Sequence, residues 1–176
     1  MPILCLESNW DGKRPSNQSV APVIETLVGL HADTAIHLWC NTAEELTHNL
    51  RHMTYGFRQG TLYLSFHGTT GKILLGNGAK VSLYELADLM GSRFAGWKIH
   101  FGSCRTLASL ARDVFKYQTG ATILSGYTET VDWIQSMAMD MFLMNESYRY
   151  TRPHNLRKRM EKLVPDLMKL TGAVIL

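Results

Sequence analysis

The hydrophobic positions of this chain fall into short apolar runs that alternate with segments of helical spacing. The apolar runs predict buried strands over Ile3–Glu7, Ala35–Cys40, Thr61–Phe66, Lys98–Gly102 and Gly120–Gly126. Apolar residues at helical spacing predict helices over Val20–Leu30, Ala43–Met53, Leu83–Met90, Thr106–Phe115 and Trp133–Asn145. Because strands and helices alternate, we expect an α/β fold, a three-layer α-β-α sandwich around a mainly parallel sheet.

Polar residues between these elements predict a turn and a helix start. Asn77-Gly78 supplies the positive φ angles of a tight turn, so the segment from Lys72 to Val81 is predicted to form a small β-hairpin after the third strand. Ser82 is followed three residues later by Glu85, which is the pattern of a capping box. A helix is therefore expected to begin directly after the hairpin.

The chain after residue 147 has a different character, which divides it into a domain over 1–147 and an extension over 148–176. The stretch Arg149–Arg159 is strongly basic, and apolar residues at helical spacing follow it until Pro165 interrupts them. We expect a helical extension packed on the domain or on a partner. The basic stretch offers a surface for nucleic acid, but no recognised nucleic-acid motif accompanies it, so a solvated helix start is the default interpretation.

Composition narrows the class of protein. The net charge of +3 is mild and does not by itself indicate a nucleic-acid partner. No apolar run approaches the roughly 18 residues of a membrane span, and the N-terminus lacks the pattern of a signal peptide. The three cysteines lack metal-ligand spacing, which indicates a cytoplasmic protein with reduced thiols, no metal and no cofactor. Cys5 and Cys40 lie inside apolar runs and are expected to be buried.

Two of the apolar runs lead to a reactive side chain. The run Leu62–Phe66 is followed by His67 and Gly68, and the run Lys98–Gly102 leads to Cys104. The carboxyl ends of parallel strands meet at one edge of a sheet, so His67 and Cys104 are expected to emerge together. A cysteine nucleophile needs a neighbouring base such as histidine, and the amides of Gly68 and Cys104 are candidate donors to an oxyanion.

Each of these residues also has a plainer interpretation. His67 alone is consistent with a histidine at a strand end whose ring is satisfied by backbone, and Cys104 alone with an inert buried thiol. Their joint position at the ends of two strands separated by one crossover favours a catalytic pair. His100 lies inside its strand and is expected to line the core.

The two motifs, Tyr63-Leu-Ser-Phe-His67-Gly68 and His100-Phe-Gly102-Ser103-Cys104, resemble those of caspase-like cysteine peptidases. The resemblance covers roughly residues 3–146 and implies a sheet of caspase-like topology. It also implies a cysteine endopeptidase with His67 as general base, Cys104 as nucleophile and the Gly68 amide as an oxyanion donor. Many relatives carry an acidic residue or glutamine just before the cysteine, whereas this chain has Gly102-Ser103, so the match is nearest to the bacterial CHAT-domain branch.

The resemblance further suggests a substrate class and a partner. In this clan the loops after the first and fifth strands help to build the pocket for the residue before the cut, and here they carry Glu7, Asp11, Glu129 and Asp132. Acidic residues there would favour lysine or arginine in a protein or peptide substrate, although Asp132 is equally suited to capping the helix that follows. CHAT proteases usually sit beside sensor repeats, so a separate activating protein and a role in bacterial defence are expected.

The sequence leaves two other functions open. One is a non-catalytic caspase-like module that scaffolds a complex through the basic tail. The other is a different thiol-dependent α/β hydrolase or transferase that acts on a small substrate.

Overall fold

The computed structural model describes residues 1–10 and 18–176 and contains a mostly parallel sheet of six strands. The strand order is β2-β1-β3-β7-β8-β9, and β9 is antiparallel to β8 while the other neighbours are parallel. The strands are β1 (Ile3–Glu7), β2 (Ala35–Trp39), β3 (Thr61–Ser65), β7 (Lys98–Phe101), β8 (Ile123–Tyr127) and β9 (Ala173–Ile175). Strands β1, β3, β7 and β8 are buried along their whole length, which explains why they read as continuous apolar runs rather than as alternating ones.

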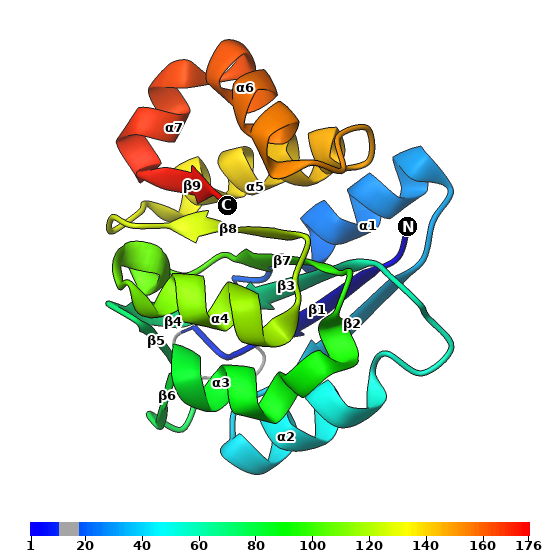
Figure 1. The fold of residues 1–176 in the computed structure, drawn as a ribbon, viewed down its shortest axis with the longest axis vertical. Helices are drawn as coiled ribbons and strands as arrows, with labels where there is room; N and C mark the ends of the chain where they lie inside the picture. Colours follow the sequence, from blue (N-terminus) through cyan, green and yellow to red (C-terminus); the bar gives the residue numbers. More distant parts are fainter. Residues whose placement is uncertain (11–17) are drawn as a thin grey trace.

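Helices cover both faces of this sheet (Figure 1). On one face lie α2 (Ala43–His52), α3 (Leu83–Met90) and α4 (Ala111–Thr119), and on the other lie α1 (Ala21–His31), α5 (Trp133–Ser147), α6 (Pro153–Leu163) and α7 (Pro165–Thr171). Short 3-10 helices occupy Gly91–Phe94 and Thr106–Ala108. The arrangement is compatible with a three-layer sandwich, and it confirms the α/β class with a mostly parallel sheet.

Apolar side chains on both faces of the sheet form the core. Leu46 of α2, Leu86 of α3 and Phe115 of α4 belong to one buried cluster with Leu62 and Phe101 of the sheet. The other face is filled by two smaller clusters, which contain among others Ile24, Leu27, Tyr127, Leu143 and Met160. Cys5 and Cys40 are free thiols buried in these clusters, as the sequence predicts.

Side-chain caps fix where two of the helices begin. The predicted capping box of α3 is present, with Ser82 Oγ accepting from the Glu85 amide at 3.2 Å and Glu85 Oε2 accepting from the Ser82 amide at 2.8 Å. The same device begins α2, where Thr42 and Glu45 make the reciprocal pair. Pro165 separates α6 from α7, as its position in the apolar pattern predicts.

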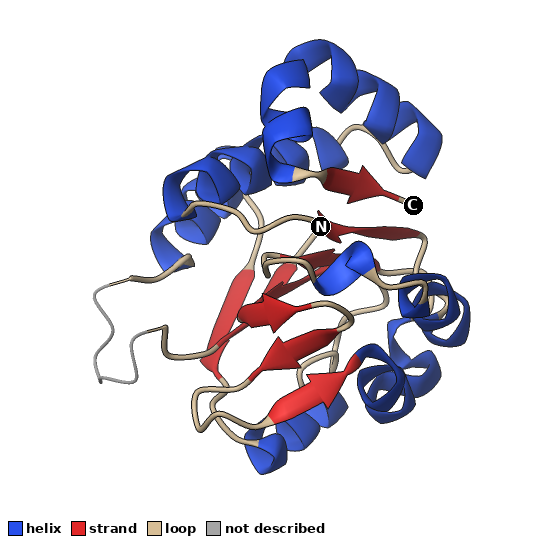
Figure 2. Ribbon diagram, turned by 90° about the vertical axis from the view of Figure 1, so that its left-hand side faces the viewer, coloured by secondary structure: helices blue, strands red, loops and turns tan. Residues whose placement is uncertain are grey.

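A second, antiparallel sheet of three strands follows β3 directly, and it faces the viewer in Figure 2. It consists of β4 (His67–Thr69), β5 (Lys72–Leu74) and β6 (Lys80–Ser82), so the predicted hairpin is present but has an additional strand. Strand β4 has no apolar alternation that would reveal it, because it contains only His67, Gly68 and Thr69. His67 therefore belongs to a strand of the small sheet rather than to a loop.

The C-terminal extension does not consist of helices alone, which corrects the expectation from sequence. After α7 the chain enters β9, where Ala173–Ile175 pairs with Ser125–Tyr127 at the edge of the main sheet. Three residues are too few for a periodic pattern, so the sequence shows no distinct strand signal there. Within the described residues, no helix is long and apolar enough to cross a membrane.

Candidate active site

The main sheet delivers His67 and Cys104 to the same edge. Strands β3 and β7 are parallel neighbours, with Leu64 paired to Phe101 and the Gly102 amide donating to the Leu64 carbonyl at 3.0 Å. His67 and Cys104 each lie three residues beyond the Leu64–Phe101 pair. Both side chains therefore follow from the shared register of the two strands at their carboxyl ends.

The backbone around Gly68 lies against the backbone around Cys104. A Cβ atom added to Gly68 would stand 2.4 Å from the Cys104 carbonyl oxygen, 2.4 Å from Thr106 Oγ1 and 2.8 Å from Ser103 Cβ. No side chain fits in this space, since Cβ contacts below about 3 Å are not tolerated by packed backbone. Glycine after His67 is thus what allows the two segments to approach each other.

The ring of His67 is exposed to solvent and held by the backbone of the β1–α1 loop. Its Nε2 atom lies 2.8 Å from the Trp10 carbonyl oxygen. A carbonyl oxygen can only accept, so Nε2 carries the hydrogen, and the neutral ring keeps its lone pair on Nδ1. The ring also meets the Trp10 indole edge to face, with centroids 4.9 Å apart. His67 is therefore oriented with Nδ1 as the nitrogen that can take a proton.

The thiol of Cys104 is half-buried and hydrogen-bonded to one backbone unit. Its Sγ atom accepts from the Val131 amide at 3.5 Å and donates to the Val131 carbonyl oxygen at 3.7 Å. The next residue, Arg105, has a φ of 55°, and its amide donates to the Glu129 carbonyl at 3.0 Å. Left-handed backbone at a non-glycine residue is costly, and such conformations cluster at functional sites. The 3-10 helix Thr106–Ala108 begins directly after Arg105.

His67 and Cys104 line the same cavity, which has a volume of about 190 Å³. Its walls come from the β1–α1 loop, the ends of β3 and β7, and the start of α5. The lining residues are Trp10, Gln18, Phe66, His67, Gly102, Cys104, Val131, Trp133 and Ser136. The cavity places an accessible thiol and a basic imidazole against the same small volume, which is the arrangement that thiol nucleophiles use.

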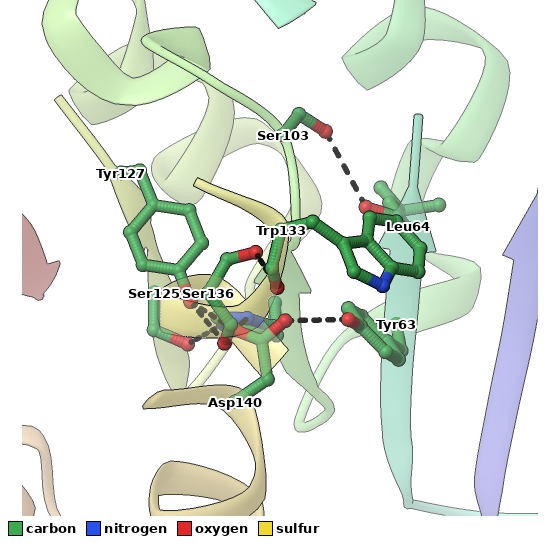
Figure 3. A network of polar contacts seen from close by, with 9 residues as sticks. Tyr63, Leu64, Ser103, Ser125, Tyr127, Trp133, Ser136 and Asp140 are labelled. Carbon is green, nitrogen blue, oxygen red and sulfur yellow. Dashed lines mark hydrogen bonds and ion pairs between the residues drawn. The ribbon is translucent and has the colours of Figure 1, made fainter. Parts of the chain in front are cut away.

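A buried polar network lies directly behind this cavity (Figure 3). The Asp140 carboxylate accepts hydrogen bonds from the hydroxyls of Tyr63 and Tyr127, and His100 Nε2 lies 2.6 Å from it. The Tyr127 hydroxyl oxygen also lies 3.1 Å from the carbonyl oxygen of Ser136, which lines the cavity. Burial, together with the Asp140 charge, raises the pKa of both tyrosine hydroxyls well above the usual range.

This network was only partly visible in the sequence. His100 is buried, as its strand position predicts, and Nδ1 of its ring lies 2.9 Å from Ser125 Oγ. The sequence does not single out Asp140. This residue lies in a Met-rich helix, and the apolar pattern of the helix does not show that one carboxylate faces inward. One member of the network, Tyr63, packs against Gly102 in the lining of the cavity. A Cβ added to Gly102 would stand 2.6 Å from the Tyr63 ring.

Glu7, one of the four acidic residues expected around a substrate pocket, is fully buried at the end of β1. Its Oε1 atom accepts from Trp10 Nε1 at 2.8 Å and from the Val20 amide at 3.0 Å. Its Oε2 atom accepts from Ser19 Oγ at 2.7 Å and lies 2.6 Å from His37 Nε2. The carboxylate is thus occupied inside the protein, and it anchors Trp10 rather than lining the cavity.

The other acidic candidates do not line the cavity either, as far as the structure describes them. Asp132 caps α5, with its Oδ1 accepting from the amides of Ile134 at 2.9 Å and Gln135 at 3.2 Å. Glu129 is exposed, and its backbone carbonyl binds the amide of Arg105. Asp11 lies outside the described residues. Within the described chain, no group of three or more His, Cys, Asp or Glu side chains is placed to hold a metal ion.

Comparison with known proteins gives a family but no function. The sequence matches DUF6642, a family of unknown function, over residues 1–171. The match spans nearly the whole chain, including both segments that carry His67 and Cys104. None of the curated proteins compared with the chain matches it.

Proposed function

We propose that the chain, which belongs to the family DUF6642, is a cysteine endopeptidase of caspase-like fold. One observation carries the proposal. His67 and Cys104, from the carboxyl ends of neighbouring parallel strands, line one cavity, and the Trp10 carbonyl holds His67 Nε2 so that Nδ1 is the basic nitrogen. Neither residue alone indicates catalysis, but their convergence on one accessible volume supports a dyad.

The reaction follows from these positions. The Cys104 thiol gives its proton to His67 Nδ1, and the thiolate attacks the carbonyl carbon of the scissile peptide bond. The oxyanion of the tetrahedral intermediate needs a hydrogen-bond donor, for which the Gly68 amide is the candidate. The intermediate collapses to a thioester while His67 protonates the leaving amine. His67 then takes a proton from water, the resulting hydroxide hydrolyses the thioester, and the proton returns to the Cys104 sulfur.

The hydrogen bonds of Cys104 support control by a partner. Its thiol donates to the Val131 carbonyl, so the sulfur must turn from Val131 toward the histidine before proton transfer. The segment that contains Val131 joins β8 to α5 and is exposed on both sides of it, at Thr130 and Asp132. A protein that binds this segment and moves it would release the thiol. We therefore include a separate activating protein in the proposal.

The fold supports the caspase-like part of the proposal without requiring it. The histidine follows β3, the cysteine follows β7, and these strands are neighbours in a sheet whose last strand is antiparallel.

The departure from the usual residue before the cysteine has a local reason. Gly102 is packed against the Tyr63 ring and Ser103 is buried, so neither position has room for a glutamate or glutamine.

A pool of peptides from a digested bacterial proteome tests the proposed function. Wild-type protein, with an extract of the native host as a source of the activator, should produce new peptide termini that mass spectrometry detects. The same termini should be absent with Cys104→Ala and with His67→Ala, since each removes one member of the dyad. New termini that persist in Cys104→Ala would rule out this nucleophile.

A further inference from the structure

We propose that the cavity beside Cys104 accepts one uncharged, apolar side chain of the substrate and excludes arginine, lysine and aspartate. The inference rests on the proposed function, because it names the substrate class of the same site. It departs from the acidic pocket that the sequence suggests.

The walls of the cavity are aromatic and aliphatic. Trp10 stands between two other rings, with centroids 4.9 Å from His67 and 4.9 Å from Trp133, and both contacts are edge to face. Phe66 and Val131 complete the apolar part of the lining. Among the residues that the structure describes, the polar side chains of the lining besides the dyad are Gln18 and Ser136, which carry no charge. Such a lining favours hydrophobic burial over ion pairing.

The size of the cavity sets the scale of its occupant. Its volume of about 190 Å³ is smaller than the roughly 300–1,000 Å³ of pockets that enclose a whole small-molecule ligand. A single side chain of the size of leucine, methionine or phenylalanine suits this space. Because Cys104 and His67 stand in the same wall, a side chain seated there belongs to a residue next to the scissile bond.

Two buried carboxylates lie near the cavity in the described part of the chain, and both are fully engaged. Glu7, behind Trp10, is fully buried and has two partners on each oxygen. Asp140, behind Ser136, is 2% exposed and is bound by Tyr63, Tyr127 and His100. Neither can pair with a substrate cation without breaking hydrogen bonds inside the protein. A guanidinium or ammonium group in the cavity would therefore lose its hydration, and neither of these two carboxylates would replace it.

The energetic consequence is strong discrimination by charge. A charged side chain that leaves water without a partner loses its hydration free energy. This desolvation penalty is large enough to lower the rate at which the substrate carrying it reacts by about 100-fold or more. An apolar side chain instead gains from burial against Trp10 and Trp133. Substrates that differ only at this position should therefore react at very different rates.

Covalent peptide probes test this specificity, and they are added to the protein together with the host extract that supplies the activator. Each probe is a peptidyl acyloxymethyl ketone with the same sequence except for the residue next to the ketone, which is leucine, phenylalanine, arginine or aspartate. The thiolate displaces the carboxylate leaving group and forms a thioether, so mass spectrometry reads the adduct on Cys104 directly. The leucine and phenylalanine probes should label Cys104 about 100-fold faster than the arginine and aspartate probes. His67→Ala should slow all four.

A charge placed in the wall supplies a second test. Ser136 lies in the first turns of α5, where an acidic residue is compatible with the helix dipole. Ser136→Asp should increase labelling by the arginine probe relative to the leucine probe by at least about tenfold. Ser136→Asn, which is matched in size but carries no charge, should not produce this change.

The possible failures are distinguishable. Absence of labelling by every probe, or labelling that does not depend on His67, overturns the proposed function and this inference with it. Labelling that depends on His67 but favours the arginine or aspartate probe overturns the specificity and leaves the dyad standing. If the protein prefers the arginine probe and this preference disappears in Asp11→Asn, then the substrate pocket at this site is acidic, as the sequence suggests.

Discussion

Replacing Glu7 by alanine should lower the free energy of unfolding by about 3–5 kcal/mol. The structure gives the reason, because this fully buried carboxylate receives hydrogen bonds from Trp10 Nε1, Ser19 Oγ and the Val20 amide and pairs with His37 Nε2. Alanine leaves the indole and amide donors buried without an acceptor, at about 1–3 kcal/mol for each group. The cavity left by the removed side chain adds to this cost.

Glutamine at the same position should cost less, about 2 kcal/mol. Its amide oxygen still accepts from Trp10 Nε1 and the Val20 amide, neither of which can reverse its role. Its NH₂ group then faces Ser19 Oγ and His37 Nε2, which can both become acceptors. What is lost is the charge, since bonds to charged groups contribute about 1.5–3 kcal/mol and neutral ones about 0.5–1.5 kcal/mol.

Urea unfolding followed by circular dichroism and tryptophan fluorescence measures both variants. Glu129→Ala is the matched control, because this exposed glutamate should change the free energy of unfolding by less than about 0.5 kcal/mol. A loss below about 1 kcal/mol in Glu7→Ala would refute the reasoning that the carboxylate anchors Trp10, Ser19 and Val20. The tryptophan signal of the folded state should also change, because Glu7 positions Trp10 against His67 and Trp133.

Three further predictions follow from other contacts. Gly68→Ala should leave the protein folded but slow Cys104 alkylation at least about tenfold, because the new methyl group must push the backbone around residue 68 away from the backbone around Cys104. The labelling rate, measured alongside circular dichroism, checks this. Asp140→Ala should lower the free energy of unfolding by about 3–5 kcal/mol in urea, because it leaves His100 Nε2 and the Tyr63 hydroxyl without their hydrogen-bond partner and removes one of the two partners of Tyr127. Burial lowers the pKa of Lys98 to about 8. Above that pH the unfolded chain binds more protons than the folded protein, so the free energy of unfolding of wild type should rise relative to that of Lys98→Met between about pH 8 and 10.

Each of these has an outcome that contradicts it. Unchanged alkylation in Gly68→Ala would show that the two backbone segments do not set the thiol's environment. A loss of less than about 1 kcal/mol in Asp140→Ala would mean that the network behind the cavity contributes little. A constant difference between wild type and Lys98→Met across that pH range would show that the amine is not desolvated.

Much of the main sheet could be predicted from the sequence because its central strands are buried on both faces. The strands Ile3–Glu7 and Thr61–Ser65 contain the unbroken apolar stretches Ile3–Leu6 and Leu62–Leu64, and a helix start such as that of α3 carries a clear cap, Ser82 with Glu85. Strands β4 and β9 were missed because each has three residues, and their place depends on a neighbouring strand rather than on their own pattern.

The acidic residues show that the roles of carboxylates could not be predicted from their positions in the sequence. Glu7 and Asp132 were expected near a substrate, but the first accepts hydrogen bonds from within the fold and the second caps α5. The sequence shows a carboxylate near a strand end and does not show which donors surround it. The same limit applies to Asp140, whose three partners come from β3, β7 and β8 and lie at least 13 positions away in the chain.

The rate at which iodoacetamide alkylates each cysteine of the native protein, in the presence of the host extract that supplies the activator, tests the central claim most directly. Burial raises the pKa of Cys40 to about 12 and raises that of Cys5 as well, so both thiols should stay unlabelled until the protein is denatured. Cys104 should react at about pH 7, and at least about tenfold faster in wild type than in His67→Ala, whereas His52→Ala should match wild type. Equal labelling of Cys104 in wild type and His67→Ala, or no labelling of Cys104 in the native protein, would contradict the dyad.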